Sequence, residues 1–169
     1  MRQTIDSLLN LLKSQVSHYQ KLSKLLEQEQ KYLIELNLEK LQETTKKKED
    51  TVLDIKILIE PLAIEIKTLA QRLGLNTNPL PTLAQLARHL REPWSGELRK
   101  AAQKLARNKT DVLRHNHDNQ HFIQDALGLI EGSLKILTGA NLEKAHQYLP
   151  TGQHAAAKPV APVKLNREV

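Results

Sequence analysis

The sequence predicts an all-α protein: an elongated antiparallel bundle or coiled coil of three long helices, with a short extra helix and a disordered C-terminal tail. Aromatic residues make up only 3% of the chain against 40% hydrophobic residues. Aliphatic side chains must therefore form the core, which favours helix-on-helix packing over a sheet. Apolar residues also recur at helical spacing, and no glycine or proline occurs between Met1 and Glu60.

The first long helix is expected from the N-terminus to about Leu33. Its apolar stripe consists of Ile5, Leu8, Leu9, Leu12, Val16, Tyr19, Leu22, Leu26 and Leu33. Ser23 and Gln30 interrupt this stripe, so the seam is weaker than that of a leucine zipper.

The second long helix begins where the apolar pattern changes phase, near Leu36. Asn37 is predicted to cap it, with Glu39 in its first turn. Its stripe consists of Leu38, Leu41, Thr45, Val52, Ile55, Leu58, Leu62, Ile66, Leu69 and Leu73. Pro61 should kink this helix, and Gly74 should end it.

A short helix and then the third long helix follow a proline-containing loop. Thr82 is predicted to cap the short helix, and Ser95 to cap the third, with Trp94 packing against its first turn. The third helix should reach about Thr138 and end at Gly139. We expect residues 1–139 to form the bundle, and residues 140–169 to form a docking segment and a flexible tail rich in Ala and Pro.

The stripe of the third helix changes character along its length. It consists of Val112, Asn116, Asn119, Ile123, Ala126, Ile130, Ser133 and Leu137. A buried amide must find hydrogen-bond partners, so it usually fixes helix register rather than adding stability. Asn116 and Asn119 are therefore predicted to be buried register residues, unless the helix is rotated so that both face solvent.

The formal net charge of +6 is compatible with acidic surfaces, nucleic acid or anionic membranes as partners. The two basic runs, Lys46-Lys47-Lys48 and Arg99 to Lys109, lack interleaved aromatic residues that could stack on bases. Because most lysines alternate with glutamates, a solvated helix surface is the better interpretation.

The sequence also lacks a secretory signal at its N-terminus and a stretch of roughly 20 apolar residues, so no membrane span is expected.

The sequence contains no convincing motif for catalysis or metal binding. His117 and His121 stand four residues apart with His115 nearby, but this pattern lacks the glutamate of the zincin motif. The chain has no cysteine and no glycine spacing that would cradle a phosphate. We therefore expect no catalytic residue, no metal and no cofactor, and we do not expect an enzyme.

Three stretches in order resemble the FlgN-type flagellar export chaperones. They are LLEQEQKYLIELNLEKLQETTKKKEDTVL (residues 25–53), LRHNHDNQHFIQDALGLIEGSLKIL (residues 113–137) and YLPTGQ (residues 148–153). The second resembles the family's Asn-x-x-Asn followed by an amphipathic helix, and the third its Tyr-x-x-x-Gly-Gln. The insert from Gly74 to Trp94 and the histidines around the asparagines depart from the family pattern.

This resemblance implies a cytoplasmic, non-enzymatic chaperone for the hook-filament junction (hook-associated) proteins. Such a chaperone binds the C-terminal amphipathic segment of its client and delivers the client to the type III export gate. The implied client contacts are Phe122, Ile123, Leu127, Ile130, Leu134 and Leu137. Tyr148, with Gly152 in the same motif, would dock at the cytoplasmic domain of the gate.

Two other functions are compatible with the residues alone. A homo-oligomeric coiled-coil scaffold would cover its apolar stripe by self-association, and the sequence leaves a homodimer open. A basic, helical nucleic-acid-binding protein would bind with an affinity that falls steeply with salt.

Overall fold

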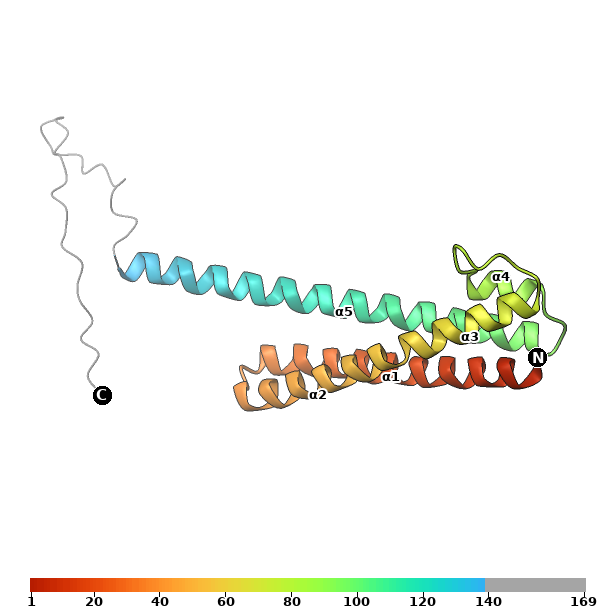
Figure 1. The fold of residues 1–169 in the computed structure, drawn as a ribbon. Helices are drawn as coiled ribbons and strands as arrows, with labels where there is room; N and C mark the ends of the chain where they lie inside the picture. Colours follow the sequence, from red (N-terminus) through yellow and green to blue (C-terminus); the bar gives the residue numbers. More distant parts are fainter. Residues whose placement is uncertain (139–169) are drawn as a thin grey trace, which may run out of the picture. The chain divides into compact units, whose positions relative to one another are not determined.

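The computed structural model describes residues 1–138, and the chain from residue 139 to 169 lies outside the description. The described elements are α1 (Arg2–Ile34), α2 (Leu38–Ile57), α3 (Ile59–Arg72), α4 (Leu83–Arg88) and α5 (Trp94–Leu137), drawn in Figure 1. They confirm the predicted all-α class. The chain divides into two compact units, residues 1–120 and residues from 121 onward, so α5 contributes to both.

α1 and α2 form a helical hairpin with a tight turn. The backbone N–H of Asn37 donates to the Tyr32 carbonyl at 3.0 Å, and Leu36 takes a left-handed conformation with φ of +52°. The side-chain oxygen of Asn37 then accepts from the Lys40 N–H at 3.1 Å, which confirms the predicted cap of α2.

The predicted second long helix is divided at Leu58 into α2 and α3. Pro61 lies in the first turn of α3, where its missing N–H costs no helical hydrogen bond. α3 ends as predicted at Gly74, whose φ is +70°. The N–H of Leu75 donates to the Ala70 carbonyl at 2.9 Å, so the helix end closes on its own last turn.

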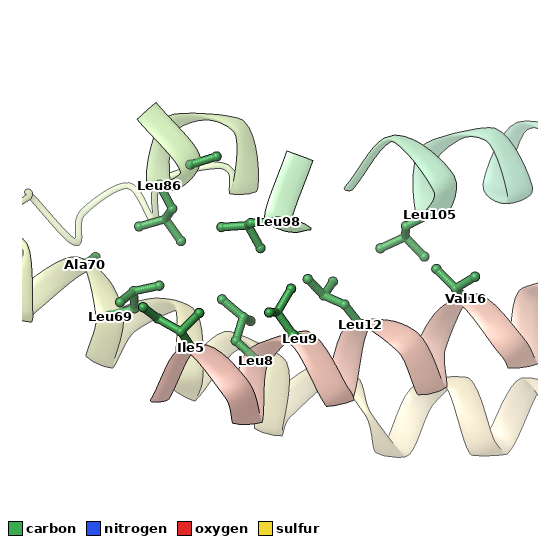
Figure 2. Packing of buried hydrophobic residues seen from close by; sticks show 11 residues of the cluster. Ile5, Leu8, Leu9, Leu12, Val16, Leu69, Ala70, Leu86, Leu98 and Leu105 are labelled. Carbon is green, nitrogen blue, oxygen red and sulfur yellow. The ribbon is translucent and has the colours of Figure 1, made fainter. Parts of the chain in front are cut away.

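The main core of residues 1–120 joins α1, α3, α4 and the start of α5 (Figure 2). Its buried residues are Ile5, Leu8, Leu9, Leu12, Val16, Leu69, Ala70, Leu86, Ala87, Leu98 and Leu105. Leu105 lies beside Val16, and farther along both helices Asn119 bonds to Leu26. α1 and this part of α5 therefore run in the same direction. This is expected, because the chain reverses its direction twice between them.

The insert between Gly74 and Trp94 contributes directly to this core. Thr82 and Gln85 form a reciprocal capping box that begins α4, as the sequence predicts for Thr82. Leu86 and Ala87 of α4 are fully buried in the main core. This extra helix thus supplies apolar surface that the three long helices do not.

The predicted N-cap role of Ser95 is wrong. α5 already begins at Trp94, and Ser95 lies buried inside its first turn. Its hydroxyl donates to the carbonyl oxygen of Ala87 at 2.7 Å and accepts from Arg99 at 3.0 Å. The serine therefore attaches α4 to α5, and Trp94 packs at the margin of the main core.

A smaller core follows along the same helices. Leu22, Leu26 and Ile55 are buried together, and Tyr19 packs against both this cluster and the main core. Burial raises the pKa of the Tyr19 phenol above its usual value. The ammonium nitrogen of Lys109 lies 5.5 Å from the centre of the Tyr19 ring.

The shifted pKa of Tyr19 predicts a loss of stability at alkaline pH. Above about pH 10 the unfolded chain releases the phenol proton while the folded chain retains it, so the free energy of unfolding falls as pH rises. Tyr19→Phe should make this fall shallower in urea titrations between pH 9 and 11. Tyr32→Phe is the control, because Tyr32 belongs to neither core cluster. An equal change of slope in both variants would contradict the assignment.

Candidate functional site

The part of α5 from residue 121 to 137 has one apolar and one polar half. At about 100° per residue, its apolar side chains gather on one side of the helix. This apolar face consists of Phe122, Ile123, Ala126, Leu127, Leu129, Ile130, Leu134, Ile136 and Leu137. The opposite side carries His121, Gln124, Asp125, Glu131 and Lys135 together with two glycines.

The apolar face is open to solvent. All six predicted client contacts lie on it, and their exposed fractions range from 38% at Phe122 to 81% at Leu137. Among residues 121–138, none is buried. A contiguous exposed apolar surface of this kind marks an interaction site rather than a core.

Sequence reasoning missed two residues of this face. Leu129 and Ile136 are 74% and 75% exposed and lie beside Phe122 on the helix surface. They fall outside a strict heptad seam, which selects one narrow line of residues. Plotting every apolar residue around the helix would have found both.

One turn before this face, Asn119 joins α5 to α1. The side chain is only 3% exposed, and its amide nitrogen donates to the Leu26 carbonyl at 2.8 Å and to Oε2 of Glu29 at 2.9 Å. The other carboxylate oxygen of Glu29 pairs with the ammonium group of Lys48 on α2. We call Glu29, Lys48 and Asn119 the polar junction, because they connect three helices.

The polar junction requires all three side chains to stay in place. Glu29 is buried, and a buried carboxylate costs stability unless both oxygens have partners. Those partners come from two other helices, so sliding either helix by one residue would leave the charge unsatisfied. This geometry supports the predicted register role of Asn119.

Two expectations for neighbouring residues are wrong. Asn116 is exposed, because three residues of helix place it about 60° away from Asn119 and off the packed face.

The basic run at Lys46-Lys47-Lys48 is not entirely a solvated surface. The Lys48 side chain is only 19% exposed and belongs to the polar junction, whereas Lys47 pairs with Glu43 at 3.7 Å on the surface.

His115 and His117 lie beside different carboxylates. Nε2 of His115 lies 3.4 Å from a carboxylate oxygen of Glu27, linking α5 to α1. His117 is exposed and lies 3.8 Å from Asp118. Over residues 1–138 no group of three or more His, Cys, Asp or Glu side chains is placed to hold a metal ion.

A second apolar area lies at the α1–α2 turn. Ile34, Leu36 and Leu38 are exposed there, and an open depression continues along α2 past Leu41 to Glu49. One helix alone lines this depression, so it lacks the converging walls of a small-molecule site.

Tyr148 and Gly152 lie outside the described residues, and their docking role stays a prediction. In residues 1–138, every helix is too short or too polar to cross a membrane.

The polar junction predicts different effects for the two asparagines. Asn119→Ala removes two buried hydrogen bonds, one of them to a carboxylate, and should lower the free energy of unfolding by about 2–3 kcal/mol. Asn116→Ala should change it by less than about 0.5 kcal/mol, because that side chain is exposed. Urea unfolding followed by circular dichroism would measure both, and equal losses would contradict the junction.

Comparison with known protein families gives one identification. The model of the FlgN protein family matches residues 1–156, which includes all of the described helices and the segment with Tyr148. Searches of curated proteins and of solved structures give no significant match. Since the family model covers most of the chain, the protein belongs to the FlgN family, a family of flagellar export chaperones.

Proposed function

We propose that this protein is a cytoplasmic chaperone that binds the C-terminal amphipathic segments of hook-associated proteins and delivers them to the type III export gate. Membership of the FlgN family supports the general kind of function. The observation that carries the specific proposal is the apolar face of α5, which no described residue covers. The client segment would lie on this face.

A helix-on-helix contact suits the task. An export client must travel unfolded, and its amphipathic segment would otherwise expose an apolar side to other chains. An apolar helix face covers that side through contacts at successive helical turns. These contacts are non-covalent and reversible. The complex can therefore dissociate when the client enters the gate.

The polar junction and the apolar face have separate roles in this proposal. Asn119 fixes α5 to α1 through buried hydrogen bonds. Among the described residues, 122–138 contribute no side chain to either core cluster. A client can thus occupy the face without displacing any part of the described core.

Tyr148 and Gly152 are proposed to dock at the cytoplasmic domain of the gate. They follow the client-binding helix directly in sequence, so client and gate contacts would lie on neighbouring segments of the chain.

A charge at the centre of the apolar face tests the client site. Ile130 lies near the middle of this face and is 56% exposed, so Ile130→Asp should leave the fold intact. The variant should weaken binding of a hook-associated protein's C-terminal segment by at least about tenfold, because binding would bury an unpaired carboxylate. Isothermal titration calorimetry measures the change.

Gln124→Asp is the matched control, because it adds the same charge to the polar side of the same helix. Binding by this variant should stay within about twofold of the original. The unmodified protein should also ignore unrelated amphipathic helices of equal length. Failure to select the hook-associated segments would exclude the proposed function.

Tyr148→Ala tests the docking segment. This variant should bind the client with unchanged affinity and should bind the purified cytoplasmic domain of the export gate more weakly, by at least about tenfold if the ring fills an apolar pocket. Pull-down and calorimetry on the loaded and the empty chaperone measure both contacts. A parallel loss of client affinity would place Tyr148 in the client site instead.

A further inference from the structure

The apolar face of α5 is wider than one partner helix can cover. At about 100° per residue, it extends over roughly 180° of the helix surface, from Ile136 at one edge to Leu127 at the other. Ser133 is the only polar side chain within this arc. A surface helix usually presents an apolar stripe of somewhat more than about 100° to the whole core, and the seam that faces a single coiled-coil partner is narrower. One bound helix would therefore leave a large part of the face in water.

α1 shows what a wide apolar arc means in this fold. Its first turns share the main core with residues of α3, α4 and the start of α5, so this side of α1 faces more than one helix. Over its first turns, the buried residues are Thr4, Ile5, Leu8, Leu9, Leu12, Gln15 and Val16. These positions span about 140° at 100° per residue. An arc of this width is thus covered by more than one helix in this fold.

Carboxylates border the apolar face on both sides. Asp125 lies directly beyond the edge formed by Leu129 and Ile136, and Glu131 lies beyond the edge at Leu127. Lys135 is the only Lys or Arg among residues 121–138, and it lies farther round the polar side. A second copy of this helix would bring the same carboxylates to the same borders, where like charges repel. A partner with basic residues along its margins is complementary.

We propose that the apolar face binds two amphipathic helical segments of one client chain side by side, so that α5 becomes the third helix of a bundle. Each segment would run about four turns, the length of residues 122–137, with Lys or Arg at the margin that meets Asp125 or Glu131. This inference rests on the proposed function and specifies the form of the client.

Two double variants separate the edges of the face. Leu129→Ser with Ile136→Ser removes one edge, and Leu127→Ser with Leu134→Ser removes the other. All four side chains are more than half exposed, so the fold should persist, as circular dichroism would verify. Gln124→Ser with Lys135→Ser, on the polar side, is the matched control.

The probe is a C-terminal fragment of a hook-associated protein of about 40 residues, long enough for two such segments and a connection. Each edge variant of the full chain should weaken binding at least tenfold, and the control should stay within twofold. Hydrogen exchange should show that each edge variant loses protection in a different stretch of the client. Light scattering should give a complex of one chaperone and one client.

Several results would overturn the two-segment client. Sensitivity of only one edge, or loss of protection in the same client stretch by both variants, would indicate a single bound helix. A complex with two chaperone chains would place a second copy on the face. Protection of one edge in the free monomer would indicate that this chain covers it itself. If the unmodified chaperone fails to bind the fragment at all, the proposed function fails, whereas single-edge binding refutes this inference alone.

Discussion

The buried carboxylate of Glu29 sets the alignment of the three helices around it. Its two oxygens are satisfied by Lys48 on α2 and by Asn119 on α5, so neither helix can shift without exposing the charge to an apolar environment. Leucines in a coiled-coil seam tolerate a shift of one heptad far better, because each meets another leucine. The apolar cores hold the helices together, and the bonds of the polar junction would be lost in a shifted register.

Much of this fold could be predicted from local signals. Asn37, Gly74 and Thr82 each act through their own backbone or a residue three positions away, so their roles are visible in the sequence. The predictions that were wrong concern side chains whose partners lie on another helix. Ser95 resembles a cap, but its hydroxyl bonds to the Ala87 carbonyl of another helix. In the sequence Lys48 looks like its lysine neighbours, and only the fold reveals that it pairs with Glu29 on another helix.

The candidate site shows the same division. The apolar residues of α5 from Phe122 onward are evident from helical periodicity, but a heptad seam describes them too narrowly and omits Leu129 and Ile136. The breadth of the apolar arc follows from the sequence, but its exposure to solvent becomes clear only in the structure, because a wide apolar arc can equally be buried, as it is on α1. Asn119 and Asn116 look equivalent in sequence, and their 60° separation around the helix decides which one is packed.

The position of the apolar face on the last described helix has an evolutionary consequence. Residues from 121 to 138 contribute no buried side chain, so substitutions there avoid the destabilisation that limits change in a packed core. Under the proposed function, partner preference can then change through exchange of aliphatic side chains of different size on this face, while Leu8, Leu69 and Leu98 stay constrained by packing. A single scaffold could in this way diversify toward new partners without passing through poorly folded intermediates.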